Sequence, residues 1–314
     1  MNLCTFKSDT DFERKIIKLC LDLYCKNPHV LDPLRQFINL PSNRTIRLYK
    51  NKREQQPGWQ RETVEWCLEA AKENNLKECD YWGGFVIDEM KVQENVEMVI
   101  KNNKHRLVGF VQLGMLHDDM HKLEGTGKTE TELASHVLQI IFLSDSGFRF
   151  PVAQFPSHDC TPSDLYDIFW KGVLMMKENN FTIYWCILDG AECNRKFIQI
   201  HFPDNDPLPH KFVAFNMYSG GPMVFMMDSK HNIKKIRNNI LKSNSTMKPR
   251  CLTVGNKKIL WSQLLAAYNY DQEQTSIHIH EKLTEQHFHL DPAAKMRNHL
   301  AEDVLDKKML YLML

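Results

Sequence analysis

The amino-acid sequence predicts a mixed α/β protein in which helices flank a sheet. Residues 81–113 consist of short apolar or alternating runs with polar breaks, which is typical of a meander of strands. Residues 148–189 then alternate strand, helix and strand, which predicts that the sheet is mixed. The segments on either side are mostly helical in pattern. We therefore expect three parts, at 1–75, 76–205 and 206–314.

The first part is expected to be a small helical segment. Thr10 and Glu13 have the spacing of a capping box, and apolar residues recur on one helical face up to Tyr24. Residues 40–51 and 59–75 suggest two more helices on either side of a break at Gln56-Pro57-Gly58.

The middle part is expected to supply the sheet. Strands are predicted within 81–92, 94–103, 105–114 and 148–155, whereas 131–144 fits a helix or a strand. An amphipathic helix begins near Ser163, and the apolar run that follows it ends in Asp189.

The last part begins with a loop-like stretch at 202–212 and continues as helices. Residues 229–243 form a basic amphipathic pattern with Ile233, Ile236, Ile240 and Leu241 inward. Further helices are expected within 257–271 and 291–314.

Composition excludes several classes of protein. The 314 residues carry a net charge of +1, so any surface for nucleic acid must be local. No apolar run reaches the roughly 18 residues of a membrane span, and the N-terminus lacks an apolar signal core, so we expect neither membrane insertion nor secretion. The 9 cysteines contain no C-x-x-C pair, which favours reduced thiols in the nucleus or cytoplasm.

Two carboxylates stand on apolar runs, Asp88 in "GGFVIDEM" and Asp189 in "WCILDG". Enzymes that cleave phosphodiesters hold divalent cations with carboxylates on rigid strands, and neighbouring strands can join acids that are distant in sequence. The alternative is that Asp189-Gly190 is a simple turn and Asp88 caps a local bend. No Ser-His-Asp or Cys-His grouping supports a nucleophilic hydrolase.

Three further patterns have two interpretations each. "EGTGKTETE" at 124–132 contains G-K-T, but Lys122 replaces the first glycine of a phosphate-binding loop, so a turn is the alternative. His278, His280, His287 and His289 alternate as zinc ligands can, or pack and face solvent. The helix at 229–243 either binds a phosphate backbone or presents a solvated face; its basic residues are Lys230, Lys234, Lys235, Arg237 and Lys242.

In combination, the motifs of residues 40–310 resemble the P-element-like transposases of animal genomes. The resemblance rests on "GFVIDEMKV", "LVGFVQLG", "FPVAQFPSHDCTPSDLYDIFWKGV", "CILDGAECNRKF", "MMDSKHNIKKIRNNILKS" and "KLTEQHFHLDPAAKMRNHLAEDVL". It implies a helix-turn-helix-like segment in 1–75, the N-terminal part of an RNase H-like domain in 76–205, and part of a GTP-binding insertion domain in 206–314.

The resemblance also implies a chemistry, namely DNA cleavage and strand transfer by three acids with Mg²⁺ or Mn²⁺, and GTP as a second cofactor. Asp189 matches the second acid. Asp88 matches the "DEM" motif, while Gln112 stands where "GFVQLG" carries an aspartate in the family, so either position is the ancestral first acid. The third acid is expected beyond Leu314, since Glu302 is a poor candidate, and the family's zinc module has no counterpart.

We therefore expect a transposase fragment that does not cleave DNA alone, in the nucleus or else the cytoplasm. The alternative is a domesticated regulatory protein that binds DNA without catalysis. The expected partners are DNA, through Lys230, Lys234, Lys235 and Arg237, and a second copy or a full-length transposase.

Overall fold

The computed structural model describes residues 10–50, 56–101, 104–114, 132–202, 212–243, 251–274 and 278–314. It divides the chain into two compact units, Met1–Gln56 and Pro57–Leu314. The first division therefore lies before the predicted boundary at residue 75. The reason is that helix α3 (Arg61–Glu73) buries Val64, Cys67 and Ala71 in the core of the sheet.

The N-terminal unit is helical, as expected. It contains α1 (Thr10–Lys26), the 3₁₀ turn η1 (Leu34–Gln36) and α2 (Asn43–Lys50). Its own small core consists of Cys20, Tyr24, Leu31 and Ile46. Arg47 Nε donates to the Tyr24 hydroxyl over 2.8 Å, which ties α2 to α1.

A seven-stranded mixed sheet forms the centre of the second unit, so the predicted fold class is confirmed. In spatial order its strands are β1 (Gly58–Trp59), β6 (Arg149–Ser157), β5 (His136–Ser144), β2 (Trp82–Lys91), β7 (Thr182–Leu188), β9 (Gly221–Met227) and β8 (Val213–Asn216). The open choice at 131–144 is thus resolved as strand. Strands β2, β7 and β9 run parallel, while β5, β6 and β8 are antiparallel to their neighbours. Strands β3 (Glu97–Lys101) and β4 (Lys104–Val108) form a separate hairpin.

Two glycines let β2 occupy the middle of this sheet. A Cβ atom on Gly84 would lie 2.1 Å from the indole ring of Trp185 in β7, and one on Gly83 would lie 2.2 Å from the Leu143 carbonyl oxygen in β5. The parallel register of β2 and β7 shifts between these glycines. Close approach of both neighbours therefore requires residues without side chains here.

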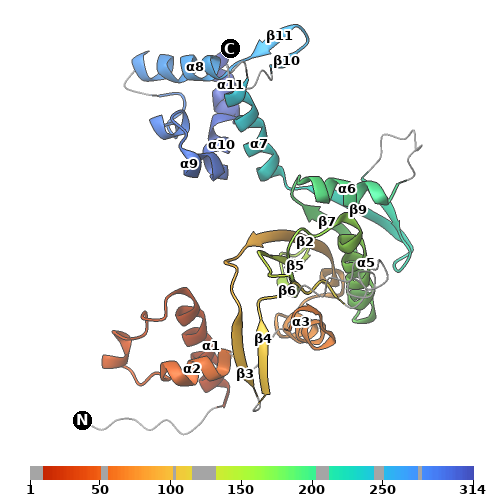
Figure 1. Ribbon diagram of the computed structural model, residues 1–314. Coiled ribbons are helices and arrows are strands. Elements are labelled where there is room, and N and C mark those ends of the chain that lie inside the picture. The colour runs from red at the N-terminus through yellow and green to blue at the C-terminus, as the bar shows by residue number, and fades with distance from the viewer. Residues whose placement is uncertain are drawn as a thin grey trace. The chain divides into compact units, whose positions relative to one another are not determined.

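Helices cover the face of the sheet on which Phe85 lies. Helix α5 (Pro162–Glu178) begins with a capping box between Thr161 and Asp164, and it crosses the sheet beside α6 (Glu192–Ile200; Figure 1). Phe169 of α5 packs edge-on against Phe85 at 5.9 Å between ring centroids and against Phe197 of α6 at 5.4 Å. This aromatic layer fixes α5 and α6 on the strands that carry the candidate acids.

The C-terminal part is mostly helical, but it starts later than residue 206, because β8 and β9 belong to the sheet. Its elements are α7 (Ser229–Lys242), the hairpin β10 (Leu252–Val254) and β11 (Lys257–Ile259), α8 (Trp261–Gln274), η3 (Glu285–His287), α9 (Pro292–Met296), α10 (Asn298–Val304) and α11 (Lys307–Met313). Ile240, Tyr268, Phe288, Val304 and Met309 are among the residues of its core.

None of the helices in the described ranges is long and apolar enough to cross a membrane.

Arg237 is an unexpected member of this interior. Its side chain is fully buried, and Nη2 donates to the Lys295 carbonyl oxygen over 2.7 Å at the end of α9. A guanidinium at a helix C-terminus satisfies carbonyl groups that the helix itself leaves unpaired. The inward face of α7 thus includes Arg237, whereas Ile236, which we expected inside, is 52% exposed.

His201 follows α6 and closes the aromatic layer in its neutral form. Its Nδ1 lies 2.9 Å from the Phe197 carbonyl oxygen, and Trp170 Nε1 donates to its Nε2 over 2.9 Å. Nε2 must therefore accept a hydrogen bond and carry no proton. Burial lowers the pKa of His201 below its usual 6.5, although hydrogen bonds to backbone carbonyls oppose this.

Stability should consequently depend on pH through His201. The stabilisation is fully present above pH 6.5, because neither state is protonated there, and it is lost as the pH falls toward the lower pKa of the folded state. The free energy of unfolding in urea should decrease between pH 7.5 and 5.5, by at most about 1.4 kcal/mol per pH unit. His201→Phe should flatten this slope, while His105→Gln, at an exposed strand position, should not. An unchanged slope in His201→Phe would contradict the assignment.

Arg237→Ala should destabilise the C-terminal helical part by about 2–4 kcal/mol, because it leaves a cavity and removes the shorter of the two hydrogen bonds to the Lys295 carbonyl oxygen. Lys242→Ala, on the exposed last turn of the same helix, should change the free energy of unfolding by less than about 0.5 kcal/mol. Urea unfolding curves of the two variants test this. Equal midpoints would show that the Arg237 contacts contribute nothing.

Candidate functional site

Asp189 stands in the short connection between β7, which ends at Leu188, and α6, which begins at Glu192. Its Oδ1 accepts a hydrogen bond from the Ala191 backbone N–H over 2.8 Å and another from Asn194 Nδ2 over 2.7 Å. These bonds fix the half-buried carboxylate at the start of α6. Its second oxygen takes no hydrogen bond from any residue described in the structure, so it is available to a ligand.

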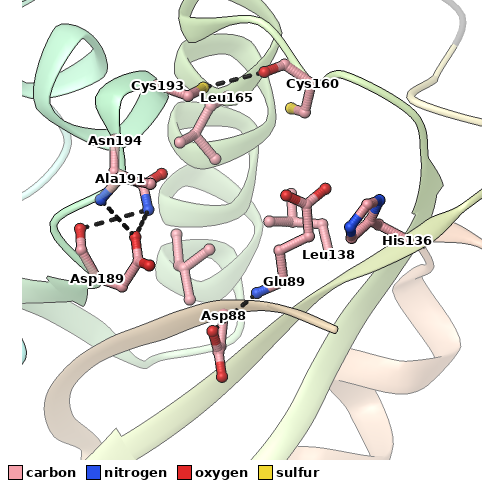
Figure 2. Close-up of a pocket in the computed structure, with 11 residues that line it drawn as sticks. Asp88, Glu89, His136, Leu138, Cys160, Leu165, Asp189, Ala191, Cys193 and Asn194 are labelled. Atoms are coloured by element: carbon pink, nitrogen blue, oxygen red, sulfur yellow. Dashed lines mark hydrogen bonds between the residues drawn. The ribbon is translucent and has the colours of Figure 1, made fainter. Parts of the chain in front are cut away.

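Asp88 and Glu89 are neighbours near the end of β2, and alternation along the strand separates their side chains. Figure 2 shows the two carboxylates on opposite sides of the strand, with that of Glu89 on the side of Cys160 and Leu165. Asp88 Oδ1 accepts the Glu89 backbone N–H over 3.0 Å, and Glu89 Oε1 accepts the Ser157 hydroxyl over 2.7 Å.

The two acids singled out in the sequence line the same cavity (Figure 2). The cavity has a volume of about 180 Å³. Its lining consists of Ile87, Asp88, Glu89, His136, Leu138, Cys160, Leu165, Asp189, Ala191, Cys193 and Asn194. Gln112, the alternative position for the first acid, is not among the lining residues; it is exposed and its backbone N–H donates to the Pro156 carbonyl.

The register of the parallel strands explains this meeting. Val86 of β2 pairs with Ile187 of β7, which pairs with Met226 of β9. Two residues further along, Asp88 lies in β2, and Asp189 and Asp228 directly follow the ends of β7 and β9. Because the carboxyl ends of parallel strands meet at one edge of a sheet, three aspartates stand in one row.

The third aspartate of this row has a structural task. Asp228 is the N-cap of α7, where Oδ1 accepts the Lys230 backbone N–H over 2.9 Å and Oδ2 is hydrogen-bonded to His231 Nδ1. Burial raises the pKa of Asp228, but the hydrogen bonds from His231 and Lys230 outweigh it, so the pKa lies below the usual 3.8. Asp228 is therefore charged near neutral pH, and both of its carboxylate oxygens are already hydrogen-bonded to residues of α7.

Two thiols close the cavity on the side of the helices. Cys193 Sγ donates to the Cys160 carbonyl oxygen over 3.0 Å. Burial and the negative charges of Glu89, Asp164 and Asp189 raise the pKa of Cys193 to about 11, and burial raises the pKa of Cys160 further. Both thiols are neutral near pH 7, so neither is an activated nucleophile.

The polar groups of the cavity suit a hard divalent cation. Asp189 offers a free, fixed carboxylate oxygen, and the neighbouring strand carries Asp88 and Glu89, of which only one at a time can face a common cation because they lie on opposite sides of β2; carboxylate oxygens are the ligands that Mg²⁺ and Mn²⁺ prefer. Within the described part of the chain, no group of three or more His, Cys, Asp or Glu side chains is arranged to hold a metal ion. The residues thus include carboxylates of the right chemistry, but fewer than three of them converge on one point.

The histidines at 278–289 have partners of a different kind. His280 is buried, with Nε2 2.9 Å from the Asp303 carbonyl oxygen, and Nε2 of the buried His287 lies 3.4 Å from Asp303 Oδ2. His278 Nδ1 lies 2.9 Å from the Asp271 carbonyl oxygen. These contacts favour the packing interpretation.

The G-K-T motif lies outside the described residues, which resume at Glu132.

The four basic residues of 229–243 proposed as DNA contacts separate into two pairs. Arg237 is fully buried and Lys234 is 8% exposed. Neither can reach a phosphate backbone in this structure, so the expectation that they contact DNA is corrected here. Lys230 and Lys235 are exposed. The helical period explains the difference, since residues 234 and 237 share a face with the buried Ile240.

Sequence reasoning did not single out Glu89, the contact of Asn194 with Asp189, or the place of Asp228 in the row of aspartates. Alternation along β2 was the available signal for Glu89, because it predicts that one residue of the Asp-Glu pair faces the helices. Asn194 stands where the first turn of α6 returns toward the end of β7, and only the structure shows that contact.

Comparison with known proteins accounts for this architecture. Residues 55–201 match the model of the TNP-like RNase H N-terminal domain. Among solved structures, the Drosophila P element transposase strand transfer complex is similar over 99% of this chain, with a TM-score of 0.67 and 17% sequence identity. The match covers 60% of that chain, so the present chain spans less than two thirds of its structural relative. No curated protein matches the sequence.

The fold and the domain match agree with the motifs. The sheet and its helices are those of an RNase H-like transposase fold, and the match includes both Asp88 and Asp189. Residues 55–201 are therefore assigned to a TNP-like RNase H N-terminal domain, and the fold is similar to that of the Drosophila P element transposase over nearly the whole chain.

Proposed function

We propose that this protein binds DNA and holds a divalent cation, Mg²⁺ or Mn²⁺, between β2 and β7, and that it does not cleave DNA alone. The observation that carries this proposal is that Asp88 and Asp189 line one cavity at the carboxyl ends of adjacent parallel strands. The family resemblance supplies the class of substrate.

Each residue of the cavity has a distinct role in this proposal. Asp189 holds the cation through its free oxygen, while Ala191 and Asn194 keep the carboxylate oriented. Asp88 is the second ligand, and Glu89 adds negative charge on the helical side. A cation bound there would polarise a phosphodiester oxygen. In-line cleavage with two cations requires ligands on both sides of the phosphate, and the described residues bring carboxylates to the cavity from β2 and β7 only.

Several parts of the proposal rest on the family resemblance. DNA as partner implies a nuclear location, and exposed Lys230 and Lys235 would supply a local basic surface on a chain of net charge +1. GTP binding and association with a second copy or with a full-length transposase are proposed on the same ground.

A second candidate is a regulatory DNA-binding protein without a metal site. It is favoured by the orientation of Asp88, whose carboxylate points to the side of β2 opposite to that of Glu89 and accepts a backbone N–H (Figure 2). In that case Asp189 only caps the start of α6, which is the alternative in which Asp189-Gly190 is a simple turn.

Titration of Mn²⁺ by calorimetry separates these candidates. Asp189→Ala and Asp88→Ala should each abolish binding, and Asn194→Ala should weaken it about 10- to 100-fold, because the carboxylate loses its orientation. Asp22→Ala, at an exposed position of α1, is the matched control and should bind as the parent does. Binding that is absent, or unaffected by both cavity variants, would favour the regulatory candidate.

Incubation with a DNA duplex and Mn²⁺ tests the other half of the proposal. The parent chain should leave the duplex intact while it retains the cation. Cleavage that disappears in Asp189→Asn would instead show that the site is a complete enzyme.

A further inference from the structure

The connection that carries the candidate acid lies against a lysine of α7. A Cβ atom built on Gly190 would lie 2.7 Å from Lys235 Nζ, and 3.5 Å and 3.7 Å from Met227 Sδ and Asn232 Oδ1. Any side chain at position 190 would therefore displace the Lys235 ammonium group. Gly190 follows Asp189 in the chain, so this ammonium lies against the connection that carries the cavity acid.

The order of the strands produces this proximity. Strands β7 and β9 are parallel neighbours, and the Asp228 backbone N–H donates to the Leu188 carbonyl oxygen over 2.8 Å where the two strands end. The start of α7 thus lies beside the start of α6. His231 and Lys235 are one helical turn apart, on the same face of α7.

The Lys235 ammonium is charged, exposed and unused. No hydrogen bond or ion pair links it to another residue in the described ranges, including Asp189. The preceding lysine, Lys234, is buried and so is not available in the same way. The other donor at this turn, Arg195 Nη1, is engaged with the Gly190 carbonyl oxygen over 2.7 Å. An exposed ammonium that pairs with no residue in the described ranges is free to bind an anion.

We propose that Lys235 binds a phosphate of the DNA backbone next to Asp189, so that α7 forms one wall of the site. This inference rests on the proposed function, because it takes DNA as the ligand. The ammonium would hold the phosphate on one side while a cation on Asp189 and Asp88 holds it on the other. Lys235 therefore positions the substrate and does not react with it.

Opposite effects on two ligands distinguish this role from that of a structural lysine. A positive charge beside Asp189 repels a divalent cation and attracts a phosphate. Lys235→Gln should therefore tighten Mn²⁺ binding in the absence of DNA and weaken DNA binding in the absence of metal. A lysine that only packs on Gly190 would produce neither effect.

The test is fluorescence anisotropy with a labelled DNA duplex of arbitrary sequence, in EDTA, at salt concentrations from 50 to 200 mM. Loss of one phosphate contact lowers the slope of log K against log salt by about 1. When the salt concentration rises across this range, the affinity of Lys235→Gln for DNA should fall by a factor about 3.5 times smaller than that of the parent. Lys242→Gln, an exposed lysine of the same helix, is the matched control and should keep the parent slope.

Gly190→Ala provides a second route to the same result. Its backbone is outside the left-handed region, so alanine is tolerated, and the added methyl group should move the flexible lysine away. Its slope should equal that of Lys235→Gln, and the double variant should show no further loss.

Equal slopes for Lys235→Gln and Lys242→Gln would overturn the role of Lys235, and so would absence of DNA binding by the parent chain. The metal site is judged separately, from the effect of Asp189→Ala on Mn²⁺ binding without DNA. Equal slopes with DNA binding intact would overturn the Lys235 role alone, whereas absence of DNA binding by the parent chain would overturn the proposed function as well.

Discussion

Parallel pairing of β2 with β7 determines where every group of the site lies. The two strands leave the middle of the sheet in the same direction, so Asp88 and Asp189 arrive at one edge although they are distant in sequence. The pairing depends on Gly83 and Gly84, whose missing side chains make room for Leu143 on one side and Trp185 on the other. A bulkier residue at either position would separate β2 from a neighbour and move the acids apart.

The second parallel pair extends this edge. Strand β9 adds Asp228 to the row and starts α7 immediately after it. Three junctions therefore meet: the end of β2, the β7–α6 turn and the β9–α7 cap. Each contributes a different kind of group, namely carboxylates, a capped carboxylate with backbone N–H groups, and an ammonium. The aromatic layer of Phe85, Phe169 and Phe197 holds α5 and α6 in place beneath this edge.

Much of this architecture could be predicted from the sequence, because period and capping signals are local. The helix beginning near Ser163, the strand ending at Asp189 and the mixed sheet follow from such patterns. The ends of the sheet domain could not be predicted in this way, since α3, β8 and β9 join it through contacts between distant segments. Arg237 was misassigned because charge suggests solvent, whereas its partner is the carbonyl group of Lys295, far along the chain. Glu89 was overlooked because it is adjacent to the acid that the motif emphasised.

The glycine pair of β2 has a consequence for the evolutionary history of such genes. When a transposase gene is retained for DNA binding alone, selection no longer acts on metal ligands, and codons such as that of Asp88 are free to drift. Gly83 and Gly84 cannot drift in the same way, because their loss disrupts the sheet itself. The ratio of change at the acids to change at the glycines, among descendants of one insertion, therefore records when catalysis ceased to be selected while the folded protein was still maintained.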